Sequence, residues 1–373
     1  MHRRTKIVAT LGPSTATLEV MEGMLRAGLD VARLNLSHGN HDTHRAQLAV
    51  ARQAAERTGR CLAIMLDLQG PKIRIERFRD GPVLLQDGQR FTLDANLAAD
   101  AGDDTQVGIT YKELPQDVQP GDCLLLADGL IRLEVESVAG AAIHTRVLVG
   151  GKLANSKGIN RLGGGLSVSA LSDKDREDIR FAAEVGADYL AVSFPRSGAD
   201  IEEARRLLNQ AGSSAGIIAK IERREALDAL EEIMEAADAV MVARGDLAVE
   251  IGDPQLAGVQ KDILRRARQH DCVVITATQM MVSMVHAPTP TRAEVLDVAN
   301  AILDGTDAVM LSEETAAGDH PVKVIAAMAE ICTGTEHYQR FHREREDSRG
   351  YTRIDEAIAK ASIDTANRLR VKA

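Results

Sequence analysis

The sequence predicts an α/β fold, a TIM (β/α)8 barrel with a small β-barrel domain inserted in the third βα loop. Three observations support this prediction. Eight short apolar runs alternate with amphipathic helix patterns, as the strands and helices of such a barrel do. Charged or polar residues stand where most of these runs end. The third and fourth runs are separated by the segment 68–188, much of which is rich in short β-like runs and turn residues.

Four of the eight runs share a local repeat, in which a small residue, one further residue and Asp precede the apolar run. The repeat occupies residues 28–37, 186–193, 236–243 and 305–312. Each copy follows a helix-like stretch, so the small residue is interpreted as a helix terminator before a buried strand. The other four runs are Lys6–Leu11, Leu62–Asp67, Ile217–Ile221 and Val273–Thr278.

Amphipathic helix patterns lie between the runs, for example Leu18–Ala27, Arg45–Arg57, Ile201–Gln210, Leu256–Gln269 and Arg292–Leu303. A doubly wound open sheet is the alternative architecture. However, no Gly-x-Gly-x-x-Gly opens a helix after a strand, and Gly150-Gly151-Lys152 lacks the rest of a phosphate-binding P-loop.

The spacing of the runs also predicts the domains. Residues 1–71 and 168–340 would form the barrel, and residues 72–167 would form the inserted β-domain, placed where it can act as a lid. A capping box at Ser172 marks the return to helix. Residues 341–373 are interpreted as a polar linker followed by one more amphipathic helix, Ile354–Leu369. We expect a homo-oligomer that assembles through the barrel.

The composition limits the class of function. The net charge is −10 with acidic and basic residues interspersed, and only 2% of residues are aromatic, which argues against a nucleic-acid-binding face. The sequence contains no run of about 18 apolar residues, so we predict no membrane span. The basic start lacks a signal-peptide core, so we expect a cytoplasmic, soluble enzyme without membrane or nucleic-acid partners. Four widely separated cysteines, Cys61, Cys123, Cys272 and Cys332, are interpreted as buried thiols.

The richest chemistry lies in residues 217–246, where two predicted strands end on Lys220 with Glu222 and on Arg244 with Asp246. An ammonium beside two carboxylates suits a divalent cation and an anionic substrate. A structural ion pair at a strand end is the alternative. The other strand ends add Arg33, Asn35, Ser37, His38, Asp67, Ser193, Thr278, Ser312 and Glu314.

This rim contains no Cys–His or Ser–His–Asp arrangement at matching strand ends, so it favours metal-assisted phosphoryl or enolate chemistry over acyl transfer. A metal cluster of His38, His41 and His44 is disfavoured, because the last two stand at the start of a helix at surface spacing.

At these positions the sequence resembles the pyruvate kinase family over nearly the whole chain. The matching segments are Thr5–Pro13, Arg33–Gly39, Asp67–Arg74, Ala219–Glu222, Met241–Leu247, Thr276–Met280, Pro290–Glu294 and Met310–Thr315. The resemblance implies a phosphotransferase that moves the phosphoryl group of phosphoenolpyruvate to ADP, giving pyruvate and ATP, in the last step of glycolysis. The physics agrees, because phosphoryl transfer needs alignment and charge neutralisation more than covalent help.

The resemblance also implies roles for individual residues. Glu222 and Asp246 would hold Mg²⁺ or Mn²⁺, and Lys220 would neutralise the migrating phosphoryl group while Arg33 grips it. Further roles are implied for the substrate carboxylate (amides of Gly245 and Asp246), for enolate protonation (Thr278 with Ser312) and for nucleotide phosphates (His38, Arg74 and Lys157). Asn35, Ser37 and Asp67 correspond to the family's monovalent-cation pocket.

The same resemblance bears on potassium. Leu68, Gln69, Lys72 and Ile75 match family members that do not require a monovalent cation, so we expect Lys72 to serve this pocket in place of potassium. An ammonium tethered near Asp67 would supply the same positive field. A solvated lysine at a domain hinge is the alternative interpretation.

The resemblance also implies that residues 341–373 are a linker and the first helix of a truncated C-terminal domain. Three residues depart from the family pattern: Ala248, Val282 and Glu313. Glu313 would add a negative charge near the protonation site. Two other function classes remain open on the residues alone. One is a pyruvate-forming aldolase or lyase on a similar barrel, which would not explain the inserted domain, and the other is a non-catalytic protein that binds metal and phosphoenolpyruvate.

Overall fold

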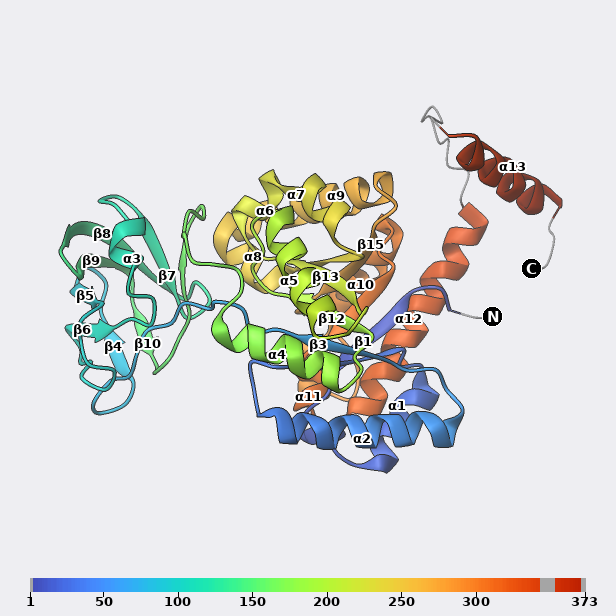
Figure 1. The fold of residues 1–373 in the computed structure, drawn as a ribbon, viewed down its shortest axis with the longest axis horizontal. Helices are drawn as coiled ribbons and strands as arrows, with labels where there is room; N and C mark the ends of the chain where they lie inside the picture. Colours follow the sequence, from blue (N-terminus) through green and yellow to red (C-terminus); the bar gives the residue numbers. More distant parts are fainter. Residues whose placement is uncertain (1–2, 343–352, 370–373) are drawn as a thin grey trace. The chain divides into compact units, whose positions relative to one another are not determined.

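The structure, a computed structural model, describes residues 3–342 and 353–369. It divides into two units, Met1–Glu336 and His337–Ala373, and every predicted site residue lies in the first. In that unit eight parallel strands close into a barrel, which runs from β1 through β2, β3 and β12 to β16 and back to β1 (Figure 1). The strands are β1 (Lys6–Thr10), β2 (Val31–Asn35), β3 (Ala63–Asp67), β12 (Tyr189–Val192), β13 (Gly216–Ile221), β14 (Ala239–Ala243), β15 (Val273–Ala277) and β16 (Ala308–Leu311).

Helices surround these strands in Figure 1. They are α1 (Leu18–Ala27), α2 (His41–Thr58), α4 (Asp173–Glu184), α5 (Gly198–Gln210), α6 (Arg224–Asp228), α7 (Leu230–Ala236), α8 (Arg244–Ile251), α9 (Asp253–Gln269), α10 (Arg292–Asp304), α11 (Glu313–Ala316) and α12 (Pro321–His342), with short 3-10 turns η1 (Pro13–Thr15) and η2 (Val282–Val285). The predicted barrel is therefore confirmed.

The repeat in the sequence has a physical explanation at the amino-terminal end of the barrel. Each of its four aspartates accepts the backbone N–H that opens or nearly opens a neighbouring strand. The bonds are Ile7 N–H to Asp30 at 2.7 Å, Ile64 to Asp188 at 2.7 Å, Ile217 to Asp238 at 2.7 Å and Val274 to Asp307 at 2.9 Å. The small residue two positions before each aspartate ends a helix. Two of these residues, Gly186 and Gly305, have left-handed φ of 63° and 103°.

The insertion forms two sheets of its own between β3 and β12. One has the order β11–β7–β8–β9–β5–β6 and the other pairs β10 with β4. The elements are β4 (Val83–Leu85), β5 (Arg90–Asp94), β6 (Gln106–Gly108), α3 (Leu114–Asp117), β7 (Cys123–Leu126), β8 (Ile131–Ala139), β9 (Ala142–Val149), β10 (Gly151–Leu153) and β11 (Ile159–Arg161). Phe91, Leu133 and Ile143 belong to its hydrophobic core, which is separate from the barrel cores. The predicted inserted β-domain is confirmed as a feature of the fold, and its boundaries at 72 and 167 stay predictions.

The cysteine prediction was partly wrong. Cys272 and Cys332 are buried, but Cys61 is exposed and Cys123 is half-buried. Cys61 lies in the short connection between Gly59, which ends α2, and β3, where Leu62 packs against the barrel core and Arg60 and Cys61 are exposed. An apolar neighbourhood in sequence therefore did not imply burial at this position.

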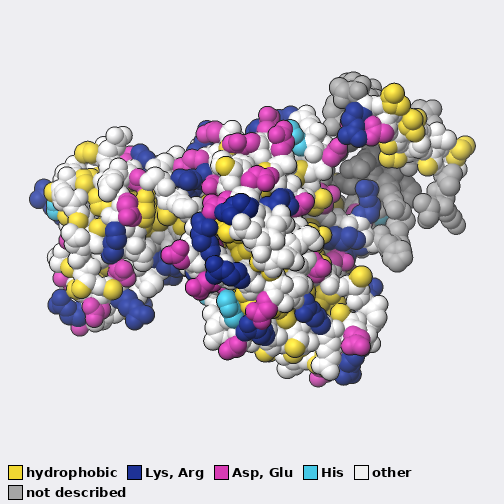
Figure 2. Space-filling model, in the orientation of Figure 1, with side chains coloured by type: hydrophobic (Ala, Val, Ile, Leu, Met, Phe, Trp, Pro, Cys, Tyr) yellow, Lys and Arg dark blue, Asp and Glu magenta, His cyan; other side chains and the backbone are white. Residues whose placement is uncertain are grey.

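The surface is mixed in charge, as the composition indicated. On the face shown in Figure 2, Lys and Arg side chains are interspersed with Asp and Glu. Within residues 3–342 and 353–369, no helix is long and apolar enough to cross a membrane.

The second unit contains α13 (Ile354–Leu369), which has the predicted bounds. Its apolar residues Ile354, Ile358 and Ile363 are exposed. Residues 343–352 and 370–373 of the predicted linker and C-terminal segment lie outside the described residues.

Candidate active site

The ammonium group of Lys220 lies at the centre of the site. Lys220 is near the carboxyl end of β13, and its Nζ atom has three acceptors: Ser193 Oγ at 2.7 Å, Glu222 Oε1 at 2.9 Å and Asp67 Oδ1 at 3.2 Å. These acceptors come from three neighbouring strands of the barrel, β12, β13 and β3, or the residues directly after them. Because the parallel strands of a barrel all end at the same rim, charges that are far apart in sequence meet at one point.

The charges in this cluster stabilise one another. Burial alone would lower the pKa of Lys220, but the carboxylates of Asp67 and Glu222 outweigh burial and raise it, so the ammonium stays charged. Burial would likewise raise the pKa of Asp67, yet Lys220 and Arg33 lower it. Glu222 differs. Burial raises its pKa to about 6 against the attraction of Lys220, and Asp246 adds repulsion.

Arg33 and the predicted monovalent-cation residues lie beside this cluster. Arg33 is buried, and it donates through Nε to Asp67 Oδ2 and through Nη1 to Thr10 Oγ1, both at 2.7 Å. Asn35 is paired with Asp67 in the β2–β3 register, and its Oδ1 atom accepts the N–H of Ser37 at 3.1 Å. The structure therefore brings Asn35, Ser37 and Asp67 together where the neighbouring strands β2 and β3 end.

Glu222 and Asp246 are the candidate divalent-metal ligands. Mutual repulsion between the two buried or half-buried carboxylates is relieved by a cation, and carboxylate oxygens are the ligands that Mg²⁺ and Mn²⁺ prefer. Among the described residues no group of three or more His, Cys, Asp or Glu side chains forms a complete metal cage. Two carboxylates nevertheless fit Mg²⁺, which usually completes its shell with water and substrate oxygens.

Lys72 pairs with one of the candidate divalent-metal ligands. Its Nζ atom is 3.1 Å from Asp246 Oδ1, and both side chains are 26% exposed. The charges in contact with Asp67 are Lys220 and Arg33. Lys72 therefore places its positive charge beside Asp246, and its role in place of potassium stays a prediction.

The start of α8 and the loop after β15 form the next part of the rim. The N–H of Gly245 donates to Thr278 Oγ1 at 2.9 Å, so Thr278 lies over the first turn of α8. Thr278 and Gln279 have left-handed backbones, with φ of 69° and 53°. Arg244 holds this loop, because its guanidinium donates to the carbonyl oxygens of both residues and pairs with Asp297 at 2.9 Å.

Ser312 is joined to the same loop through Glu314. This buried carboxylate accepts the N–H of Ser312 at 2.7 Å and the N–H of Met281 at 3.3 Å. Of the three departures from the family pattern, Glu313 and Val282 are exposed and Ala248 is buried in α8.

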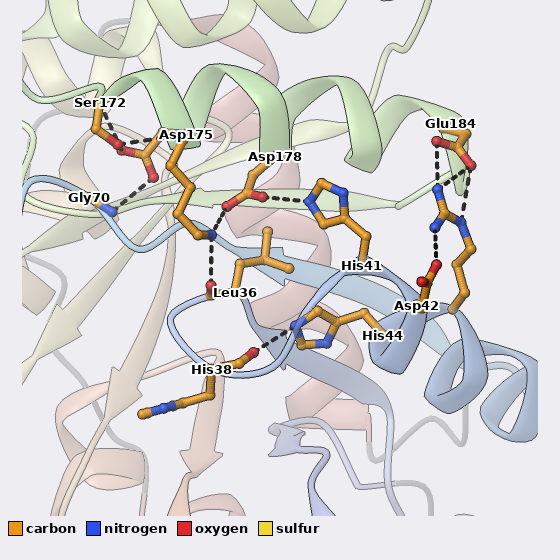
Figure 3. A network of polar contacts seen from close by, with 12 residues as sticks. Leu36, His38, His41, Asp42, His44, Gly70, Ser172, Asp175, Asp178 and Glu184 are labelled. Atoms are coloured by element: carbon orange, nitrogen blue, oxygen red, sulfur yellow. Dashed lines mark hydrogen bonds and ion pairs between the residues drawn. The ribbon is translucent and has the colours of Figure 1, made fainter.

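A polar network supports the loop after β2 (Figure 3). Asp178 of α4 pairs with His41 at 2.7 Å and with Lys174 at 2.5 Å, and Lys174 donates to the carbonyl oxygen of Leu36. His44 also holds this loop, because its Nε2–H donates to the carbonyl oxygen of His38 at 2.9 Å.

The expected surface position of His44 was wrong, since it is 5% exposed. The loop folds back over α2 and covers it, and burial lowers its pKa. The side chain of His38 itself points away from the network in Figure 3 and is exposed.

Arg74 and Lys157 lie side by side in the insertion. Arg74 forms an isolated antiparallel bridge with Gly158, next to Lys157, and Arg74 Nη1 donates to the carbonyl oxygen of Ser156 at 2.9 Å. The structure thus groups two of the three residues predicted for nucleotide phosphates.

One group that contacts a candidate metal ligand was not predicted from the sequence, the backbone N–H of Phe194. The N–H of Phe194 donates to Glu222 Oε2 at 2.8 Å. Every residue except proline carries such a donor, so no residue type in the sequence marks it.

The fold and the rim define the class of protein: a (β/α)8-barrel enzyme whose buried ammonium and carboxylates are arranged for an anionic substrate and a divalent cation. Comparison with known proteins then gives the family. The model of the pyruvate kinase barrel domain matches residues 2–325. Pyruvate kinase II of Salmonella typhimurium is 54% identical over 373 residues, covering 99% of this chain and 78% of the relative.

Two further comparisons agree. A pyruvate kinase of Haemophilus influenzae is 53% identical over 373 residues, with 99% of this chain and 78% of the relative covered. A crystal structure of a pyruvate kinase from Cryptosporidium parvum superposes with a TM-score of 0.92 at 35% identity, covering 99% of this chain and 77% of that one. The chain belongs to the pyruvate kinase family and is a phosphotransferase, as its sequence motifs predicted.

Proposed function

We propose that this chain transfers the phosphoryl group of phosphoenolpyruvate to ADP, giving pyruvate and ATP, in the last step of glycolysis. The observation that carries this proposal is the buried Lys220 ammonium, held among Ser193, Glu222 and Asp67 in a chain of this family. The enzyme acts on small molecules in the cytoplasm and assembles into a homo-oligomer through the barrel.

Lys220 and Arg33 provide the positive charge that meets the migrating phosphoryl group. All three N–H bonds of the Lys220 ammonium have acceptors in the protein, so an incoming phosphoryl or enolate oxygen replaces one of them. Arg33 uses Nε and Nη1 within the protein, and its Nη2 group has no partner among the described residues. Nη2 is therefore the part of the guanidinium that grips the phosphate.

The start of α8 binds the substrate carboxylate. Its amides at Gly245 and Asp246 lie in the first turn, where backbone N–H groups have no partner within the helix and the helix dipole is positive. Thr278 accepts the Gly245 N–H in the structure, so the carboxylate takes the place of this hydroxyl. The displaced Thr278 then faces the enolate carbon and, with Ser312 and water, delivers the proton that yields pyruvate.

Glu222 and Asp246 hold the divalent cation, Mg²⁺ or Mn²⁺. When bound, the cation neutralises phosphate and enolate charge and orients the substrate. His38, Arg74 and Lys157 bind the nucleotide phosphates. Asn35, Ser37 and Asp67 form the monovalent-cation pocket, and the ammonium of Lys72 makes potassium unnecessary.

The test is ATP formation from phosphoenolpyruvate and ADP with Mg²⁺. We expect turnover in the wild-type protein and a loss of about 100-fold or more in kcat for Lys220→Met, because the variant lacks a preorganised charge at the reacting group. Lys323→Met, which removes an exposed lysine of α12, is the matched control and should retain activity.

No ATP from the wild-type protein would contradict the proposal and favour the aldolase or binding-protein alternatives. Near-normal turnover of Lys220→Met would remove Lys220 from the mechanism.

A further inference from the structure

We propose that the turn Ser193–Phe194 is a positioning element that sets both Lys220 and Glu222 for the reaction. The two residues follow β12 directly and contact the two charged residues of the neighbouring strand end: Ser193 holds the ammonium, and Phe194 holds the carboxylate. The inference rests on the proposed function. It assigns residues that work through Lys220 and Glu222 and do not themselves touch substrate.

Ser193 fixes the direction of the Lys220 ammonium. Its Oγ atom donates to the carbonyl oxygen of Leu68 at 2.8 Å, and the other acceptor within reach, Asp67 Oδ1, is more distant at 3.4 Å, so the hydroxyl proton is directed to Leu68. A lone pair of Oγ therefore faces Lys220 Nζ at 2.7 Å, the shortest of the three ammonium contacts. Because this acceptor is neutral, it orients the ammonium without reducing the positive charge presented to the phosphoryl group.

Phe194 fixes the Glu222 carboxylate through its backbone. Its φ of 57° is left-handed, which is uncommon for a bulky residue and persists where the surroundings enforce it. In this conformation its N–H points to Glu222 Oε2 at 2.8 Å. Glu222 Oε1 meets Lys220, so the two oxygens have separate partners and the plane of the carboxylate is set.

Close packing around the turn enforces this backbone. The Phe194 ring is buried, and the Arg223 guanidinium carbon is 5.5 Å from its centroid. Gly70 also packs against the turn, since an added Cβ there would come within 2.8 Å of Ser193 Cβ and 2.9 Å of Phe194 Cδ2. Arg223 and Gly70 thus confine the turn, and a smaller, flexible side chain at 194 would let the N–H rotate away.

The experiment separates turnover from metal binding. For Ser193→Ala we expect kcat to fall by about 10- to 100-fold, with KM for phosphoenolpyruvate and Mn²⁺ affinity changed by less than about 3-fold. For Phe194→Leu we expect Mn²⁺ affinity to fall by about 10-fold. Affinity is measured on the full chain without substrates, from the electron paramagnetic resonance of free Mn²⁺.

Matched controls make the same changes away from the turn. Thr276→Val removes a buried hydroxyl that contacts Thr306, and Phe181→Leu shrinks a buried ring in α4. Both should keep kcat and Mn²⁺ affinity even if the melting temperature falls. If Phe194→Leu does not fold, Arg223→Met removes the cation above the ring and should weaken Mn²⁺ binding in the same direction.

The inference is overturned if Ser193→Ala keeps kcat within about 2-fold of the wild type, or if Phe194→Leu and Arg223→Met bind Mn²⁺ as tightly as the wild type. Parallel loss of kcat, metal affinity and melting temperature in both variants and controls would also overturn it, since that pattern reports general destabilisation. Failure of the proposed function is distinct, because it would show as no ATP formation by the wild-type protein, and Mn²⁺ binding would still test Phe194.

Discussion

At the scale of single residues, Lys72 places a positive charge beside Asp246, a candidate metal ligand. We predict that the wild-type enzyme is about equally active in potassium buffer and in tetramethylammonium buffer, and that Lys72→Glu becomes potassium-dependent. The physical reason is that the variant places a carboxylate beside Asp246, so the cluster loses a positive charge that a free monovalent cation must then supply. Initial rates at matched ionic strength measure the effect.

Lys112→Glu is the control, since it makes the same charge reversal at a half-exposed position of the insertion. The initial rate of this variant should be about the same with and without potassium. A wild-type enzyme that is silent until potassium is added would contradict the role of Lys72.

At the scale of an element, the repeated aspartates join helix ends to strand starts. We predict that Asp188→Ala lowers the free energy of unfolding by about 1 to 3 kcal/mol, because the N–H of Ile64 loses its acceptor. Asp188→Asn should lower the free energy of unfolding by less, since its amide oxygen can still accept the N–H of Ile64. Urea unfolding measures both. Because Ile64 lies near the amino end of β3 and the site lies at the other, kcat should be nearly unchanged in both variants.

Equal losses for Asp188→Ala and Asp188→Asn would show that the carboxylate charge, not the hydrogen bond, provides the stability.

At the scale of the whole molecule, Glu250 of α8 lies where the chain returns from the insertion. Its carbonyl oxygen accepts the N–H of Gly163, and its carboxylate accepts the N–H of Arg224 at 2.9 Å. Burial raises its pKa to about 7, although the Arg224 N–H and the charge of Arg223 oppose this. The folded protein then binds a proton that the unfolded chain has released, so stability falls as the pH rises from about 4.5 to about 7.

We therefore predict that Glu250→Gln gains stability relative to the wild type as the pH rises from about 5 to about 8, by on the order of 2 kcal/mol. Urea unfolding across this range measures the difference. Glu202→Gln, an exposed glutamate of α5, is the control and should show no such trend. A wild-type protein that is stabilised over the same range relative to Glu250→Gln would contradict the assigned direction.

The sequence predicted the barrel well because its signal is local. Each strand is a short apolar run, and each helix has its own periodicity. It also predicted that Lys220, Glu222 and Asp67 share a rim, since strand order alone requires this. It could not predict the pairing of Lys72 with Asp246 or the burial of His44, because both depend on how loops fold back in space. The role of the repeated aspartates could not be predicted for the same reason, because each of them accepts an N–H from a strand that is adjacent in the barrel but distant in sequence.

Closure of the barrel has a consequence for how the chain is made. β1 pairs with β16 from Lys6–Ala308 to Ala9–Leu311, so one edge of the first strand has no partner until almost the entire barrel sequence has been synthesised. At about 5–20 residues per second this delay is roughly 15–60 s. The insertion has its own hydrophobic core and needs only its own residues to pack. On the ribosome, the insertion is therefore positioned to fold first, while the nascent barrel remains an open sheet whose unpaired edge is exposed to pairing with another chain.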